Sequence, residues 1–157
     1  MACDGLYEGR ALIGEDFEER RVCIEVTGGR ITAIEEVRQT PEHWIVPALY
    51  NAHTHIGDIV AMDVAAEGSL TDLVTPPDGL KHRILAATRR QALTVAMRCA
   101  IVEMAAAGIQ GCADFREGGP EGVQALRDAA DGLPIAVLCL GRDGGERYAD
   151  GVGISSV

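Results

Sequence analysis

The sequence predicts an α/β protein in which an antiparallel β segment comes first and parallel β/α units follow. Two alternating stretches around a glycine pair, residues 21–26 and 30–37, indicate a β-hairpin. Apolar residues then recur at spacings of three and four between residues 93 and 108, which is typical of a helix packed on a core. Helices and apolar runs alternate from there on, as they do around a parallel sheet. We therefore expect one domain over residues 1–47 and a second over residues 48–157.

Local patterns define the elements of the first domain. Residues 6–13 can form a strand before the hairpin, and a short apolar piece, residues 44–46, lies between two prolines. We expect the first 45 or so residues to be antiparallel throughout.

The second domain should begin with a strand and a long loop of about 25 residues. The helix that follows should start near Lys81 or Ala86 and stop at Gly108. A strand over residues 109–115, a helix from Pro120 to Gly132 and a strand over residues 135–140 come next. The last residues resemble the start of one more strand, and the connection before it is too short and glycine-rich for a full helix.

Composition excludes several classes of partner. The chain has 24 acidic against 14 basic residues in a length of 157, a net charge of −10, so it should repel nucleic acid and anionic membranes. Its five cysteines form no Cys-x-x-Cys pair, and neither a signal peptide nor a membrane-spanning run is evident. We expect a cytoplasmic protein with a small-molecule partner.

The stretch VPALYNAHTHIGD, residues 46–58, carries the most chemistry. His53 and His55 are two residues apart, so on a strand both imidazoles face one point in space. Imidazole nitrogen suits zinc, iron, nickel or copper, which makes this a metal-ligand spacing. Two exposed or hydrogen-bonded histidines at a strand end remain the alternative.

Taken together, the β-rich start, the proline-led strand, the Asn-Ala before the pair and the β/α repeats resemble the amidohydrolase superfamily. Its strand-1 motif is matched by PALYNAHTH, with Ala48 and Tyr50 as departures that affect packing and not ligation. Within the family the sequence is nearest the cytosine deaminase and chlorohydrolase-like branch, and the strings LVTPPDGLKHRIL and CADFREGG resemble uncharacterised archaeal members.

The resemblance implies a specific architecture. Residues 1–47 would be the amino-terminal part of a small β-sandwich, and residues 48–157 the first half of a (β/α)8 TIM-like barrel. His53 and His55 would be the first two ligands of one divalent metal ion, with zinc the first choice and iron or manganese as alternatives. Because Lys81, the only lysine, lies before the first helix and not on strand 4, a single-metal site is favoured over a pair bridged by a carboxylated lysine.

The family's remaining ligands and catalytic acid/base are not in this sequence, and a barrel needs about 250 residues. We therefore expect an apparently truncated, amino-terminal portion that is inactive alone. Uncovered strand edges should make it aggregate or form a homo-oligomer.

Further site residues have weaker signals. Asp114, Arg116 and Glu117 should lie at the carboxyl end of the second strand, facing the mouth of the site. There Arg116 should bind a substrate carboxylate or phosphate, or else form a local ion pair. His82 is a candidate substrate contact, because it follows a long loop of the kind that often binds ligands. The alternative is a solvated surface histidine at the start of a helix. Asp58 and the nearby Asp63 are candidates for carboxylates that orient the two histidines by hydrogen bonding. The alternative is that both are solvated acidic residues of a loop. A catalytic thiol is disfavoured, because Cys112 and Cys139 fall in the expected strands, where a free cysteine usually packs in the core as a small apolar residue.

Three functions follow from these observations. The first is a metal-dependent hydrolase in which metal-activated water attacks a C–N bond of a small molecule, by deamination or by amide or ring hydrolysis, in the full-length form. The second is a catalytically incomplete fragment or a non-enzymatic binding or assembly subunit. A nuclease or phosphoesterase from another His-x-His barrel family is a weaker third, because those barrels begin directly at strand 1.

Overall fold

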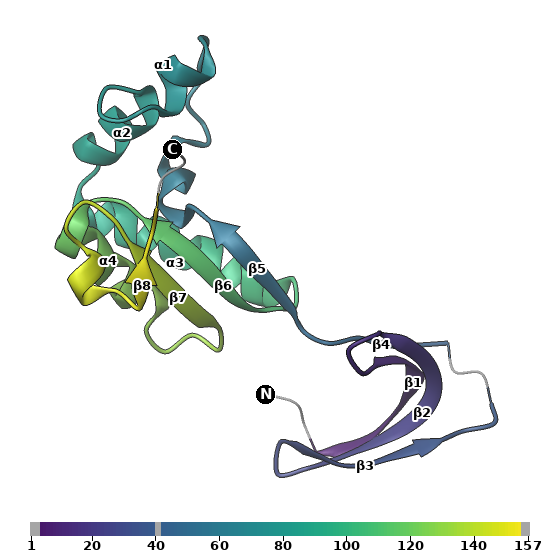
Figure 1. Ribbon diagram of the computed structural model, residues 1–157. Coiled ribbons are helices and arrows are strands. Elements are labelled where there is room, and N and C mark those ends of the chain that lie inside the picture. The colour runs from purple at the N-terminus through teal and green to yellow at the C-terminus, as the bar shows by residue number, and fades with distance from the viewer. Residues whose placement is uncertain (1–3, 40–41, 155–157) are drawn as a thin grey trace. The chain divides into compact units, whose positions relative to one another are not determined.

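The computed structural model describes residues 4–39 and 42–154, and the chain divides into two compact units, Met1–Ala48 and Leu49–Val157. Figure 1 shows a β-only unit at the amino-terminal end and a unit of strands and helices after it.

The amino-terminal unit is a four-stranded sheet of order β3-β2-β1-β4. The expected hairpin is confirmed: β2 and β3 pair antiparallel, and a Gly28-Gly29 turn joins them with φ of +60° and +72°, backbone angles that glycine adopts without strain. The expectation of antiparallel pairing throughout is wrong, because β4 pairs in parallel with β1. The strands are β1 (Gly5–Ile13), β2 (Glu18–Thr27), β3 (Arg30–Glu36) and β4 (Trp44–Ile45).

The core of this sheet comes from alternate residues of one strand. Val22, Ile24 and Val26 of β2 are buried with Ala11 of β1, and Ile45 of β4 packs against them. Residues between them on β2 point away, as the period of two in the sequence predicts.

The second unit is built on four parallel strands in the order β5-β6-β7-β8, which confirms a mixed α/β fold with a parallel sheet. Thr54 pairs with Asp114 and Asp114 with Cys139, so the carboxyl ends of neighbouring strands lie side by side. The strands are β5 (Leu49–Thr54), β6 (Ile109–Arg116), β7 (Ala136–Gly141) and β8 (Gly151–Val152).

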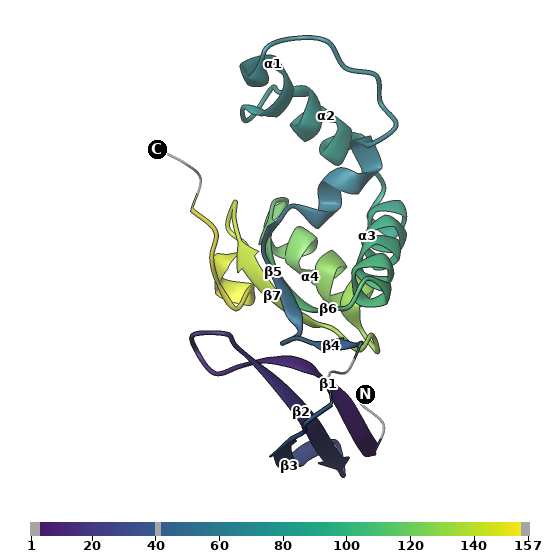
Figure 2. The same cartoon turned by 90° about the vertical axis from the view of Figure 1, so that its right-hand side faces the viewer.

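Helices α3 (Arg90–Ala106) and α4 (Gly119–Ala130) cover one face of this sheet (Figure 2). The apolar stripe of α3 supplies Met97 and Ile101 to the core, and α4 supplies Leu126. Buried cysteines of β6 and β7 pack with them, as expected for small core residues.

The expected helix start near Lys81 or Ala86 is wrong, because two helices occupy that stretch. Helix α2 (Leu80–Ala87) ends at Ala87 and α3 begins at Arg90; the two residues between them, Thr88 and Arg89, are extended, with ψ of 126° and 138°. The Thr88 hydroxyl donates to the Ile84 carbonyl at 2.7 Å and so occupies a helical acceptor.

The rest of the long connection after β5 is also partly helical. A 3-10 turn, η1 (Ile56–Ala61), follows the strand, and the short helix α1 (Leu70–Val74) precedes α2. Only a 3-10 turn, η2 (Glu146–Tyr148), lies between β7 and β8, which confirms that no full helix fits there. The expected last strand is present as β8, and residues 155–157 lie outside the described residues. Among the described helices, none combines the length and the apolar character needed to cross a bilayer.

Candidate metal and substrate site

His53 and His55 converge at the carboxyl end of β5. Their Nε2 atoms are 3.4 Å apart, so the two imidazoles present their outer nitrogens to the same point. Both rings lie beside Phe115 of β6, with ring centroids 4.5 Å and 5.8 Å from that of the phenylalanine. The phenylalanine ring therefore packs against both imidazoles without forming a hydrogen bond to their nitrogens.

The inner nitrogen of His55 faces a carboxylate from the next strand. His55 Nδ1 lies 3.1 Å from Glu117 Oε1 and 3.4 Å from Lys81 Nζ. Lys81 also forms ion pairs with Glu117 Oε1 at 3.0 Å and Asp58 Oδ2 at 2.9 Å. Two segments far apart in sequence, α2 and the end of β6, thus meet at the histidine pair.

Glu117 is the hub of this cluster, with its side chain only 8% exposed. Besides His55 and Lys81, it pairs with Arg116 Nη2 at 3.1 Å and lies 3.5 Å from Arg142 Nη1. Burial opposes ionisation, but the hydrogen bonds from His55 and Lys81 and the charges of Lys81 and Arg116 outweigh it and hold the pKa of Glu117 well below its ordinary value. The carboxylate is therefore ionised at neutral pH.

A second buried carboxylate, Asp114, lies on β6 beside Thr54, the last residue of β5. Its side chain accepts hydrogen bonds from the Thr54 hydroxyl, at 3.1 Å, and from the Ile56 amide, which ties the end of β5 to β6. Arg116 Nη1 lies 3.5 Å from Asp114 Oδ2. Burial raises the pKa of Asp114, and the charge of Arg116 and these hydrogen bonds only partly offset that effect.

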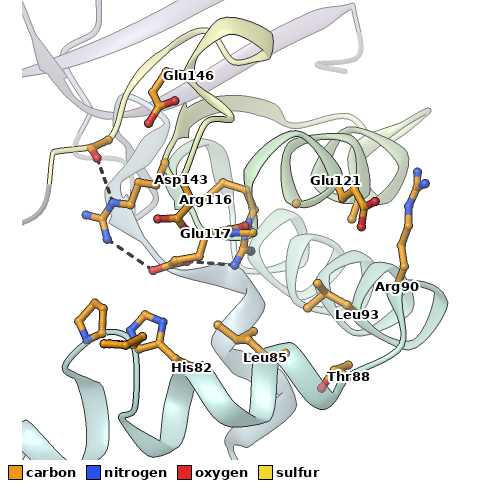
Figure 3. Close-up of a pocket in the computed structure, with 18 of the residues that line it drawn as sticks. His82, Leu85, Thr88, Arg90, Leu93, Arg116, Glu117, Glu121, Asp143 and Glu146 are labelled. Atoms are coloured by element: carbon orange, nitrogen blue, oxygen red, sulfur yellow. Dashed lines mark hydrogen bonds and ion pairs between the residues drawn. The ribbon is translucent and has the colours of Figure 1, made fainter.

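A cavity of about 800 Å³ adjoins this cluster (Figure 3). Arg116 and Glu117 line it from β6, and His82 and Leu85 of α2 line another side. Neither histidine of the pair is among its lining residues, so Glu117 is the group shared by the cavity and the histidines. Its remaining walls mix apolar and charged side chains, among them Leu93, Glu121, Asp143 and Glu146.

The weaker candidates from the sequence fall in different places. The Arg116 guanidinium is 1% exposed and engages two carboxylates, so it belongs to the interior of the site. His82 lines the cavity, and its Nε2 donates to the Val74 carbonyl at 3.1 Å. The Asp58 carboxylate pairs with Lys81, and its backbone amide donates to the His55 carbonyl at 2.9 Å, whereas Asp63 is exposed.

Sequence reasoning missed how two members of the cluster contact His55. Lys81 was placed before the first helix, but it lies in the first turn of α2 with its side chain 14% exposed. Glu117 is expected from the sequence at the mouth of the site, because it follows the strand that neighbours β5, but its contact with His55 is not predicted.

The donor set fits part of a metal site. Two imidazole nitrogens at this separation suit zinc, iron or copper, and a carboxylate on the inner nitrogen is the usual partner of a metal-bound histidine. Among residues 4–39 and 42–154, no group of three or more ligating side chains comes together. The described residues thus bring together two candidate ligands, fewer than the four that zinc usually takes.

A model of the amidohydrolase family matches residues 44–145. The chain belongs to the amidohydrolase family. It is 42% identical over 142 residues to a protein of Methanothermobacter thermautotrophicus that carries the provisional name aminohydrolase, a match that covers 86% of the chain and 37% of that protein. An uncharacterised protein of Methanocaldococcus jannaschii is 34% identical over 144 residues, covering 87% of the chain and 38% of the relative. The resemblance seen in the sequence, including that to archaeal members, is confirmed, and this amidohydrolase chain spans under two fifths of both relatives.

Solved structures share the fold. The atrazine chlorohydrolase of Arthrobacter aurescens, whose crystal structure contains zinc, superposes with a TM-score of 0.59 at 18% identity over 87% of this chain and 35% of its own. A triazine hydrolase variant gives a TM-score of 0.58 with the same identity and coverage. At this identity the likeness concerns the fold alone.

Proposed function

We propose that this amidohydrolase chain provides the first part of a metal-dependent hydrolase that attacks a C–N bond of a small molecule, by deamination or by amide or ring hydrolysis. The convergence of His53 Nε2 and His55 Nε2, 3.4 Å apart at the carboxyl end of β5, carries the proposal. Active sites of β/α barrels lie on that face of the sheet. In this proposal, residues 48–157 are the first β/α units of such a barrel and residues 1–47 part of a β-sandwich.

His53 and His55 would hold one divalent cation, with zinc the first choice and iron or manganese as alternatives. Such an ion lowers the pKa of water and polarises the bond under attack. The chain's own contribution is rigidity: β5 fixes the backbone of His53, and His55 lies between β5 and η1. Phe115 lies against both rings, and Asp114 holds the start of η1 through the Ile56 amide.

The cavity is the proposed place for part of the substrate. It is large enough for a small cyclic or amide compound, and its mixed lining supports a neutral or zwitterionic ligand over a polyanion such as nucleic acid. His82 is the proposed substrate contact on α2. For Arg116 we propose a positioning role, because its guanidinium is buried and shared between Asp114 and Glu117.

Metal analysis tests the proposal. Metal content (zinc, iron and manganese) and hydrolytic turnover should be measured in the full-length protein of which this chain would be the first part. The site variants are His53→Ala and His55→Ala, and the matched control is His43→Ala, an exposed histidine of the other unit. We expect both site variants to lose metal and hydrolytic turnover, and the control to keep them. Turnover that persists in His53→Ala would refute the proposal.

A second candidate is a non-enzymatic binding or assembly subunit. The absence of a third ligand among the described residues favours it. It predicts no stoichiometric metal under any loading condition, so one bound ion per chain would exclude it.

A further inference from the structure

We infer that the Glu117 carboxylate, held in place by Lys81, positions His55 by selecting the ring tautomer that leaves Nε2 free to bind a cation beside His53 Nε2. The inference rests on the proposed function for its purpose, since the cation is the one proposed there. Glu117 and Lys81 are positioning residues, because they act on the inner nitrogen of the ring and not on the ion.

The distances decide which group controls Nδ1. A neutral imidazole carries one proton, and the nitrogen without it is the one that binds metal. Glu117 Oε1, at 3.1 Å, can only accept, so it places the proton on Nδ1 and leaves Nε2 bare. A bond from Lys81 to Nδ1 would have the opposite effect, and would put the proton on the nitrogen that faces His53.

Lys81 has better partners than the imidazole. Its Nζ lies 2.9 Å from Asp58 Oδ2 and 3.0 Å from Glu117 Oε1, against 3.4 Å from His55 Nδ1. Because both nearer groups are carboxylates, the ammonium protons go to them and the contact with His55 stays secondary. Lys81 thereby holds Oε1 against Nδ1 instead of competing for it.

The surroundings lock this arrangement. The side chains of Glu117 and Lys81 are 8% and 14% exposed, so little water competes for either. The other oxygen, Oε2, is fixed by Arg116 Nη2 at 3.1 Å, which prevents the carboxylate from rotating away. Oε2 therefore serves Arg116, and Oε1 serves His55 and Lys81, with Arg142 Nη1 at the longer distance of 3.5 Å.

The ring tautomer can be measured in the metal-free protein by two-bond ¹H–¹⁵N correlation of its histidines at pH 8, with the His55 signals assigned from their loss in His55→Gln. We expect the wild-type ring to carry its proton on Nδ1. In Glu117→Gln the side-chain amide can donate to Nδ1, so the Nε2–H form should become the major one. Glu103→Gln, an exposed glutamate on α3 outside the cavity, is the matched control and should leave the spectrum unchanged.

Lys81 is tested in the same way with Lys81→Met, against Arg83→Met, an exposed cation on the same helix. Loss of the ammonium should produce a mixture of both tautomers, and the control should not. A wild-type His55 in the Nε2–H form would overturn the inference, and so would a Lys81→Met spectrum identical to wild type. The wild-type and Lys81→Met spectra decide the matter even where Glu117→Gln fails to fold.

Zinc binding provides the second readout, by competition with a chromophoric chelator. Loss of a partner of a metal-bound histidine typically weakens metal affinity by about 10- to 100-fold, and we expect that range for Glu117→Gln and no change for Glu103→Gln. Unchanged zinc affinity in Glu117→Gln would count against the positioning role. If wild type has the Nδ1–H tautomer but binds zinc no better than His53→Ala, the proposed function fails while the assignment of the tautomer to Glu117 stands.

Discussion

Replacing Arg116 with methionine should destabilise the protein by about 3 kcal/mol at pH 7. Arg116 is 1% exposed and lies between Asp114, 0% exposed, and Glu117, 8% exposed, so the change leaves two buried carboxylates without their shared cation. Removing one partner of a buried ion pair costs about 3–5 kcal/mol. The lower end applies, because Glu117 keeps Lys81 as a partner and methionine refills much of the volume.

Urea unfolding of both proteins measures the loss. The matched control is Arg90→Met: its side chain is 53% exposed and pairs with Asp128 at the surface of the same unit, so about 1 kcal/mol or less should be lost. The pKa of Asp114 is already raised in the folded protein and should rise further without Arg116. A carboxyl group whose pKa is higher in the folded than in the unfolded state stabilises the fold at pH values below its unfolded-state pKa, and this stabilisation is lost as pH rises. The loss of unfolding free energy in Arg116→Met should therefore grow between pH 4 and pH 7. A loss below 1 kcal/mol, or one that shrinks with rising pH, would refute this account of Arg116.

Three further predictions follow from the same region. In Gly57→Ala the new methyl group would overlap the Arg116 guanidinium, so unfolding should show a loss of about 1–3 kcal/mol, and unchanged stability would contradict the packing. Burial, and then a neighbouring carboxylate, raise the pKa of the Cys112 thiol to about 11, so mass spectrometry after brief iodoacetamide treatment at pH 8 should find Cys99, which is exposed, modified and Cys112 intact. Because the pKa of Glu117 is lowered by folding, its ionised form stabilises the protein at pH values above its unfolded-state pKa, and this stabilisation is lost as pH falls. Glu117→Gln should therefore flatten the decline of unfolding free energy below about pH 4.5. Parallel plots of unfolding free energy against pH for the two proteins would argue against this account.

The sequence was sufficient for elements that local pattern and one buried face define. The alternation of Val22, Ile24 and Val26 predicted β2, and the stripe containing Met97 and Ile101 predicted α3. The boundary between α2 and α3 could not be predicted in this way. It depends on two extended residues after Ala87, whose side chains fit a continuous helix almost as well.

The candidate site shows the same limit. His53 and His55 were found because their relation is local: two residues on one strand must share a face. Glu117 and Lys81 are 62 and 26 residues from His55, and their contacts depend on how β6 and α2 pack. Arg116 was expected at the mouth of the site because it lies at the carboxyl end of the second strand. It does line the cavity, but its guanidinium is buried between two carboxylates, a packing that the sequence does not show.

The break between α2 and α3 also affects how the site opens. Neither α1 nor α2 contributes a buried residue, whereas α3 is anchored in the core through Met97 and Ile101. Local unfolding of residues 62–88 therefore costs less free energy than global unfolding, and their amides should exchange with deuterium sooner than those of α3. Because Lys81 lies in that segment, each such opening withdraws the ammonium from Glu117 while β5 and β6 stay folded. The histidine pair is thus supported by two groups with different lifetimes: a carboxylate as long-lived as the sheet, and an ammonium that leaves whenever this short segment unfolds.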